Sequence, residues 1–346
     1  MDFEKFIGDK KEINMGFIGG SITEGAGASV QDKCFVSRVC EELGKKYDGV
    51  QFNQINAGVG GTTSNLGLFR MERDLQSKKP DIVFIEFAVN DIELEYTGVY
   101  VENIIRQTYQ YNKEIPVVIL LTAKVENIEK YGAVRNTPSA KQHIEIGKYY
   151  NIPVINMGDE MYEYANENGI DFNDLFCDGV HPKDSGYEIY TNIILEHLKR
   201  IELNIIDDTL PLLYKRRISN PRLLMGSTLA NDTWKLSCYD MYGRLPNYIY
   251  SYTPGDELTF EFDGTFLGIY YTVEKDSGTL EYKVDNREWQ KEALWDKYAL
   301  GGNRAHYLTL CEELNDGTHT VTIRNSYEKE EKSEGHYVRI GAFTVG

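Results

Sequence analysis

A lone serine stands in the stretch GFIGGSITEG, Gly16 to Gly25, directly after a short apolar run. Two glycines precede Ser21, so no bulky neighbour in the sequence covers its hydroxyl. The stretch could form a phosphate-binding loop, a tight turn or the seat of a nucleophile. Its glycine spacing fits neither the dinucleotide pattern G-x-G-x-x-G nor the P-loop pattern. A turn and a nucleophilic serine are the two interpretations left.

A serine becomes a nucleophile when a neighbouring base takes its proton. Among the six histidines, His181 stands apart because it lies in CDGVHPKDSGY, between an apolar run and a helix-like segment. Asp178 comes three residues earlier, close enough to hold the Nδ1–H of His181 and leave Nε2 free to face Ser21. A single D-x-x-H pattern also occurs in ordinary surface loops, so the fold must place the pair beside the serine.

An acyl-transfer site also needs donors for the oxyanion that develops on the substrate carbonyl. Three groups offer them: the backbone N–H groups of the glycines in INAGVGGTTS (residues 55–64), the side-chain amide of Asn90 in FAVND, and the N–H of Ser21. Taken singly, these segments are typical of helix caps and turns. Because each follows an apolar run, their convergence on one edge of a sheet favours a catalytic site.

The elements that position these loops alternate between strand-like and helix-like segments. Short β-branched apolar runs are typical of buried parallel strands, and the longer segments between them have helical spacing. The runs are INMGFI, FNQINA, DIVFIEFAV, PVVILLTA and IPVINM. They predict a three-layer α/β/α domain with a five-stranded parallel sheet over residues 1–204. Ligands of such sheets bind at the carboxyl ends of the strands, where the candidate residues lie.

Residues 205–346 show short alternating runs separated by turn motifs. They predict an all-β, antiparallel, jelly-roll-like sandwich of seven or eight strands that is similar to a carbohydrate-binding module. Its segment WQKEALWDKYALGGNRAHY carries four candidate sugar contacts, and we expect it to fold over the catalytic rim, because aromatic faces stack on sugar rings. These candidates are Trp295, Tyr298, Arg304 and His306. The alternative is that the aromatic residues belong to the core of the sandwich.

The motifs GGSIT, NAGVGG, AVND and DGVHP resemble, in their order and spacing, the four blocks of the SGNH (GDSL-type) hydrolase family. The resemblance extends from Ile13 to Ile201. It implies that Ser21 is the nucleophile, that His181 is the general base and that Asp178 orients the histidine.

The same resemblance implies an oxyanion hole formed by the N–H groups of Ser21 and Gly61 and by the amide of Asn90. Gly61 is chosen because it stands five positions after Asn56, where the family has its glycine. The sequence departs from the family pattern twice: Gly20 replaces the aspartate of G-D-S, and AVND replaces Gly-x-Asn-Asp. Neither departure removes a catalytic group, and both resemble the branch that deacetylates carbohydrates.

The layout is similar to that of two-domain acetylmannan and acetylxylan esterases. The resemblance therefore implies a serine esterase that removes O-acetyl groups from mannan or xylan oligosaccharides through an acyl-enzyme, without cofactor or metal. Two alternatives stay open: a lipase or thioesterase acting on short acyl esters, and a non-catalytic carbohydrate-binding protein. The acidic residues Asp91, Glu93 and Glu95 are expected to cap a turn and face water rather than to bind a cation.

Charge and composition exclude several partners. The formal net charge of −17, from 37 basic and 54 acidic residues, argues against nucleic acid and anionic membranes and suits a neutral substrate. The sequence shows no apolar run long enough for a membrane span and no signal peptide, which predicts a cytoplasmic protein. The five cysteines are scattered without a C-x-x-C pair, which predicts reduced, mostly buried thiols. The oligomeric state is left open.

Overall fold

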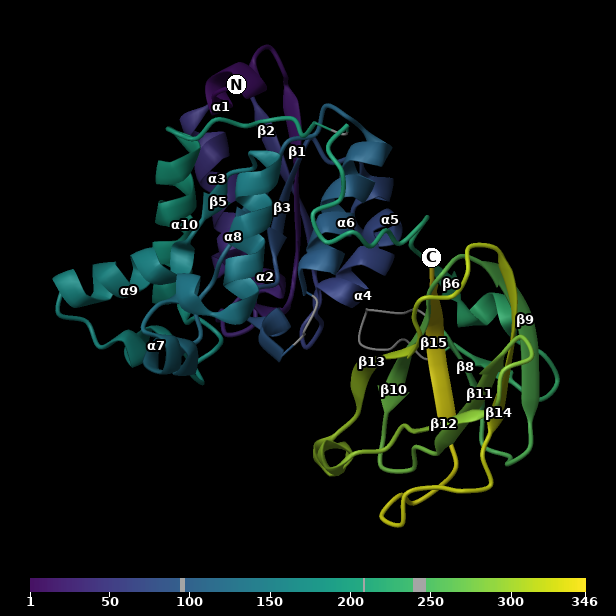
Figure 1. Ribbon diagram of the computed structural model, residues 1–346. Helices are drawn as coiled ribbons and strands as arrows, with labels where there is room; N and C mark the ends of the chain where they lie inside the picture. The colour runs from purple at the N-terminus through teal and green to yellow at the C-terminus, as the bar shows by residue number, and fades with distance from the viewer. Residues whose placement is uncertain (94–96, 208, 239–246) are drawn as a thin grey trace. The chain divides into compact units, whose positions relative to one another are not determined.

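The computed structural model describes residues 1–93, 97–207, 209–238 and 247–346 (Figure 1). The chain divides into two compact units, Met1–Arg217 and Ile218–Gly346. The first unit is an α/β domain and the second is built from β-strands, as the sequence predicted.

The first unit contains a five-stranded parallel sheet in the order β2-β1-β3-β4-β5. Its strands are β1 (Glu12–Gly19), β2 (Gln51–Gly58), β3 (Ile82–Glu86), β4 (Val117–Leu120) and β5 (Val154–Ile155). Every residue of β3 and β4 is buried, as expected for central parallel strands with helices on both faces. The predicted parallel sheet is thereby confirmed.

Ten α-helices lie in the described part of this unit. They are α1 (Phe3–Ile7), α2 (Ser21–Glu24), α3 (Phe35–Lys46), α4 (Ser64–Phe69), α5 (Met71–Asp74), α6 (Thr97–Tyr111), α7 (Val125–Tyr131), α8 (Pro138–Tyr150), α9 (Met157–Glu167) and α10 (Asp184–Leu198). Helices α3 and α10 pack together, and α6 packs against both α4 and α8. The two groups form the outer layers of the three-layer domain (Figure 1).

Helix α3 illustrates how the pattern of the sequence produces a layer. Its buried residues include Phe35, Val39 and Leu43, which recur at helical spacing, while Lys45 and Lys46 lie in its last turn. The apolar stripe faces the sheet, and the two lysines stand where the negative end of the helix dipole favours positive charge.

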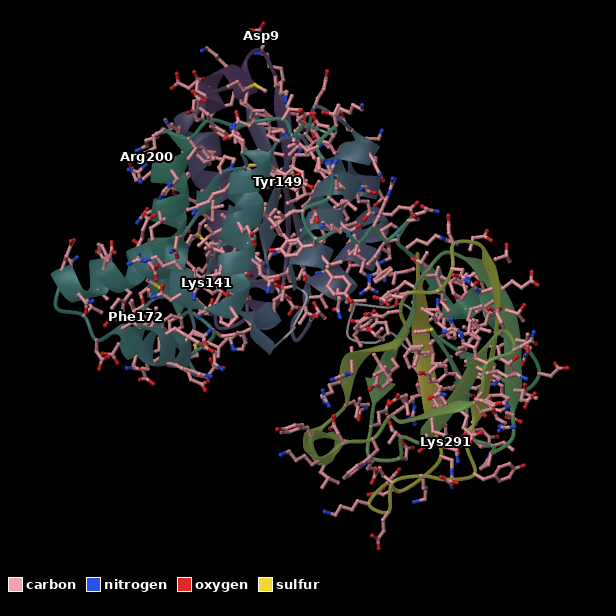
Figure 2. The ribbon with its side chains drawn as sticks, viewed as in Figure 1. Asp9, Lys141, Tyr149, Phe172, Arg200 and Lys291 are labelled. Carbon is pink, nitrogen blue, oxygen red and sulfur yellow. The ribbon has the colours of Figure 1, made fainter. Side chains whose placement is uncertain are left out.

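The segment between α10 and the second unit packs on the surface of the first unit. Glu102 of α6 is buried and accepts hydrogen bonds from the backbone N–H groups of Leu213 (2.6 Å) and Tyr214 (3.0 Å). Tyr149 of α8 donates to the carbonyl of Pro211 at 3.0 Å (Figure 2). These bonds hold the segment on α6 and α8, so the compact units divide after Arg217 rather than after residue 204.

The second unit consists of two antiparallel sheets. One has the order β13-β10-β15-β8-β7, with β6 also paired to β15, and the other has the order β12-β11-β14-β9. The strands are β6 (Arg222–Met225), β7 (Lys235–Ser237), β8 (Tyr248–Ser251), β9 (Glu257–Asp263), β10 (Leu267–Val273), β11 (Thr279–Val284), β12 (Gln290–Ala293), β13 (Arg304–Cys311), β14 (Thr318–Asn325) and β15 (Val338–Val345). The predicted antiparallel all-β unit is confirmed.

The described part of this unit holds ten strands, β6 to β15, whereas the alternating pattern predicted seven or eight. Both β6 and β12 have four residues, and neither alternates between buried and exposed positions, so the sequence carried no period-two signal for them. Strand β9 shows the opposite case, because Leu258, Phe260 and Phe262 point into the core while the residues between them are exposed.

The thiols are distributed differently from the prediction. All five cysteines are free, but Cys34 and Cys40 are the two that are buried, while Cys177 and Cys238 are exposed and Cys311 is intermediate. Within the described ranges, each helix is too short or too polar to cross a lipid bilayer.

Candidate active site

Ser21 lies at the carboxyl edge of the sheet, where the direction of strand order reverses. Strand β1 pairs with β2 on one side and with β3 on the other, and its last residue is followed by Gly20 and the short helix α2. Ser21 is the first residue of α2, so its N–H has no partner within the helix. This is the rim at which ligands of doubly wound sheets bind.

The structure brings Ser21, Asp178 and His181 together as the sequence predicted. His181 Nε2 lies 2.8 Å from the hydroxyl oxygen of Ser21, and His181 Nδ1 lies 2.7 Å from Oδ2 of Asp178. With Nδ1–H donating to the carboxylate, Nε2 is free to accept the serine proton. The side chain of His181 is 28% exposed, so the group lies open to a substrate.

The Asp178 carboxylate is held in its ionised form by the loop it belongs to. Oδ1 accepts the backbone N–H groups of Val180 (3.0 Å) and His181 (2.9 Å). Partial burial acts to raise the pKa of Asp178, but the hydrogen bonds from the backbone and ring of His181 and from Val180 outweigh it and lower the pKa to about 2. An ionised carboxylate fixes the tautomer of His181 and stabilises the imidazolium that forms when the serine is deprotonated.

Other histidines of the chain also face carboxylates, so a carboxylate partner alone does not distinguish His181. Its contact with the Ser21 hydroxyl does. His197 pairs with Glu160 at 2.6 Å, and His319 pairs with Asp285 at 2.7 Å while its second ring nitrogen faces a backbone carbonyl. Within the described residues, His181 is the histidine that joins a carboxylate on one ring nitrogen to a serine hydroxyl on the other.

The backbone N–H groups of the glycine-rich loop after β2 differ in whether the protein supplies them with an acceptor. The N–H of Gly58 donates to the side chain of Asn56 (2.8 Å), that of Val59 to the carbonyl of Gly19 (3.1 Å), and that of Gly60 to Glu24 (2.8 Å). In the described part of the chain, the N–H of Gly61 has no protein acceptor. Gly61 is exposed and has a φ of +71°, a conformation that glycine adopts without strain.

Asn90 packs directly against Gly20, the residue before Ser21. A Cβ atom added to Gly20 would lie 2.3 Å from Oδ1 of Asn90 and 2.7 Å from its Cγ. The missing side chain at Gly20 is therefore what lets the Asn90 amide lie beside Ser21. Ser21, Gly61 and Asn90 thus all follow strands at the carboxyl edge of the sheet, although a shared oxyanion-binding role stays a prediction.

Three further side chains hold these loops in place. Glu24 accepts the N–H of Gly60, and Asn56 donates to the carbonyl of Thr23 at 2.9 Å. Arg70 is buried and donates to the carbonyls of Ala57 (2.5 Å) and Gly19 (2.9 Å), which end two neighbouring strands. Arg70 therefore holds the ends of β1 and β2 together beneath the site.

Asp91 was expected to face water, but it does not. It is fully buried; its Oδ1 accepts the N–H of Ser64 at 2.8 Å, and its Oδ2 lies 3.4 Å from Nε2 of the buried His143. Asp91 caps the first turn of α4 and so connects the loop of Asn90 to the loop of Gly61. The predicted capping role of Asp91 is therefore present, but the capping carboxylate lies in the interior of the domain. The side chain of Glu93 and the whole of Glu95 lie outside the described residues.

The four predicted sugar contacts differ in their surroundings. Trp295 is partly buried against the core of the sandwich, whereas Tyr298 is 64% exposed. Arg304 pairs with Asp296, and the ring of His306 lies 3.4 Å from the hydroxyl of Tyr271. A role for these residues in sugar binding stays a prediction.

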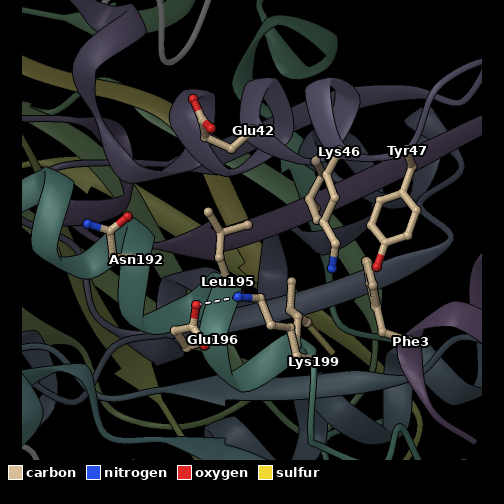
Figure 3. A pocket seen from close by; sticks show the side chains of 10 residues that line it. Phe3, Glu42, Lys46, Tyr47, Asn192, Leu195, Glu196 and Lys199 are labelled. Atoms are coloured by element: carbon tan, nitrogen blue, oxygen red, sulfur yellow. Dashed lines mark hydrogen bonds and ion pairs between the residues drawn. The ribbon is translucent and has the colours of Figure 1, made fainter.

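A surface hollow of about 230 Å³ lies elsewhere on the first unit, among α1, α3 and α10 (Figure 3). Phe3, Tyr47 and Leu195 contribute apolar surface, and Glu196 pairs with Lys199 at its rim. Ser21, Asp178 and His181 do not line it, so it plays no part in the chemistry derived from them.

The sequence did not predict Glu24, Arg70 or Glu86 as residues of the site. Glu24 lies within the stretch GFIGGSITEG, and Glu86 interrupts the apolar run DIVFIEFAV. A charged residue inside a buried strand is a signal that the sequence did offer, because an uncompensated buried charge is costly. Arg70 gave no comparable signal, since arginine is common on helix surfaces.

The model of the GDSL-like lipase/acylhydrolase family matches residues 17–189, which contain all of the catalytic candidates. The chain belongs to this family. Membership confirms the resemblance carried by the four motifs.

Solved structures extend the likeness to both units. A two-domain esterase active on acetylated mannans, co-crystallised with mannopentaose, is 24% identical with a TM-score of 0.80, covering 96% of this chain and 90% of that one. Another structure of a two-domain esterase active on acetylated mannans is 23% identical with a TM-score of 0.81, covering 97% and 92%. At this identity the likeness shows the fold. No curated protein matches the sequence.

Proposed function

We propose that this acylhydrolase is a carbohydrate esterase that removes O-acetyl groups from oligosaccharides of the mannan or xylan type. The observation that carries the chemistry is the chain of contacts from Asp178 through His181 to the Ser21 hydroxyl, at 2.7 and 2.8 Å. The substrate class is supported by the activity on acetylated mannans stated for the two-domain esterase of similar fold.

In the first half-reaction, His181 Nε2 takes the proton of Ser21 as the serine oxygen attacks the acetyl carbonyl. The negative charge that develops on the carbonyl oxygen is stabilised by the N–H groups of Ser21 and Gly61 and by the Asn90 amide. Each donor contributes on the order of 2.7–4 kcal/mol to lowering the barrier. Collapse of the tetrahedral intermediate breaks the ester bond, and the sugar oxygen leaves with the proton from His181.

In the second half-reaction, His181 takes a proton from water, and the resulting hydroxide attacks the acetyl-serine carbonyl. The same donors stabilise the second oxyanion, and acetate leaves as Ser21 regains its proton from His181. The chemistry written here uses the side chains and backbone N–H groups named above and one water molecule.

The experiment that tests this function is acetate release from acetylated manno-, xylo- and chito-oligosaccharides, compared between wild type and Ser21→Ala. Ser77→Ala is the matched control, because Ser77 is an exposed serine whose hydroxyl donates to the carbonyl of Arg73. Release from manno- or xylo-oligosaccharides that Ser21→Ala abolishes and Ser77→Ala retains supports the proposal.

Cleavage of 4-nitrophenyl acetate without release from any sugar would keep the esterase and reject the carbohydrate substrate. A series of nitrophenyl esters with longer acyl chains then tests the lipase or thioesterase alternative. Highest activity on long chains would favour a lipase or thioesterase with an extended acyl channel over an acetyl esterase.

A further inference from the structure

Glu86 is a buried carboxyl group that the reaction above does not use. It ends β3, is 1% exposed and stands beside Gly19 in the register of β1 and β3. Burial raises its pKa to about 7, against the effect of hydrogen bonds from Thr122 and Thr23, while the negative charge of Asp91 adds to the rise. A carboxyl group in an apolar strand costs stability, so packing alone does not explain its presence.

Both oxygens of Glu86 accept hydrogen bonds from threonine hydroxyls. Oε2 accepts from Thr23 at 2.8 Å, and Oε1 accepts from Thr122 at 2.7 Å. Thr23 lies two residues after Ser21 in α2, and its backbone carbonyl is held by Asn56. The bond from Thr23 therefore fixes the turn that carries the nucleophile.

The bond from Thr122 leads to the other half of the site. Thr122 lies in the segment between β4 and α7, in which the N–H of Ala123 donates to the hydroxyl of Tyr190 at 2.9 Å. The N–H of Val125, which follows this segment as the first residue of α7, donates to the carbonyl of Gly179 at 2.8 Å. Gly179 directly follows Asp178 and stands two residues before His181, so this segment supports the loop of the acid and the base.

We propose that Glu86 is a positioning residue for the esterase reaction, which fixes the turn of Ser21 relative to the loop of Asp178 and His181 through the hydroxyls of Thr23 and Thr122. The inference rests on the proposed serine chemistry. Glu86 contacts neither substrate nor reacting atoms, and it acts on the distance between Ser21 and His181 through its two threonine partners.

The test compares variants that remove a hydroxyl with variants that keep it. Thr23→Val and Thr122→Val lose the bonds to Glu86, whereas Thr23→Ser and Thr122→Ser retain a hydroxyl. Thr191→Val is the matched control, because Thr191 is also a buried threonine whose hydroxyl donates to the carbonyl of Tyr187 within α10. Two readouts are used: the rate at which a fluorophosphonate labels Ser21, and kcat and KM for 4-nitrophenyl acetate.

We expect Thr23→Val and Thr122→Val to lower the labelling rate and kcat by about 10- to 100-fold, because a misplacement of roughly 1 Å costs up to that factor. KM is expected to change much less, and the two serine variants are expected to recover most of the rate. Glu86→Gln keeps groups that can bond to both threonines and is expected to lose far less than Glu86→Leu.

Valine variants that label at the wild-type rate while their melting temperature falls would overturn the proposal, because the network would then be structural only. So would serine variants that fail to recover the rate although they are folded. The failure of the proposed function gives a different result: folded wild-type protein would not be labelled at Ser21 at all. The comparison at Thr23 keeps the test decisive if Glu86→Leu does not fold.

Discussion

The clearest prediction concerns Gly20, at which the chain departs from the G-D-S pattern of its family. The φ of Gly20 is −89°, outside the left-handed region, so a Gly20→Ala variant does not carry the strain of a positive φ. The new Cβ would lie 2.3 Å from Oδ1 of Asn90, and real Cβ atoms essentially never lie closer than 3.0 Å to another heavy atom. The Asn90 amide must then move by roughly 1 Å to reach ordinary van der Waals distance.

A displaced Asn90 amide is expected to act as a missing oxyanion donor. The loss of one such donor costs about 10²- to 10³-fold in kcat, or about 2.7–4 kcal/mol. We expect Gly20→Ala and Asn90→Ala each to show a loss of this size with little change in KM for 4-nitrophenyl acetate. Because both changes act through the same amide, the double variant is expected to be no slower than Asn90→Ala alone.

The double-mutant cycle decides whether this reasoning holds. Additive losses would show that Gly20→Ala acts somewhere other than on Asn90, and a Gly20→Ala variant with wild-type kcat would show that the amide is not needed where the structure places it. Gly44→Ala is the control, because a Cβ on this exposed glycine of α3 meets no atom within 4 Å. It is expected to leave kcat unchanged and to stabilise the helix by roughly 0.5–1 kcal/mol.

Three further predictions follow from other contacts of the site. Asp178→Asn is expected to lower kcat by up to about 10⁴-fold, because the variant no longer holds His181 in the required tautomer and no longer carries the negative charge that stabilises the imidazolium. A loss below about tenfold in the same kinetic assay would contradict the role given to the carboxylate. Glu24→Ala is expected to lower kcat about 10- to 100-fold by releasing the Gly60 N–H and the loop beyond it, whereas Glu24→Gln, which still offers an acceptor, retains most of the rate. Glu86, with a pKa raised from 4.5 to about 7, is protonated in the folded chain over a pH range in which the unfolded chain ionises it. It therefore destabilises the fold increasingly as pH rises from 4.5 to 7, and Glu86→Gln should gain up to about 3 kcal/mol on wild type between pH 4 and pH 8. Urea unfolding followed by circular dichroism at 222 nm measures this gain in the helical unit, and a difference between the two proteins that does not change with pH would contradict it.

The sequence was sufficient for the architecture and for the three residues of the Ser21, Asp178 and His181 group. Their loops follow strands, and the carboxyl ends of parallel strands share one edge, so a correct assignment of strands places the loops together. The boundary between the units was harder to predict. The segment that ends at Arg217 has no periodicity, and what holds it is Glu102, a buried carboxylate that accepts backbone N–H groups more than a hundred positions away.

The supporting contacts of the site could not be predicted from the sequence for a related reason. A bond such as that of Glu24 to the Gly60 N–H depends on the exact path of a loop, and no period or motif encodes that path. Asp91 shows the same limit, since an acidic residue after a strand is typical of an exposed turn, yet here it is buried and caps α4. Local patterns predict elements well, but they do not tell which loop will cover a given side chain.

Glu86 and Asp91 nevertheless share a property that sequence reasoning can use. Both carboxyl groups are buried, both lie at or just beyond the carboxyl end of β3, and the charge of Asp91 raises the pKa of Glu86. Two buried acids so close together weaken the fold, so their presence requires a compensating use. Each accepts a hydrogen bond from a group that fixes a catalytic loop: Thr23 beside Ser21 for Glu86, and Ser64 after the Gly61 loop for Asp91. An acidic residue inside an apolar strand that leads into a candidate site is thus a sign of residues that position the catalytic groups.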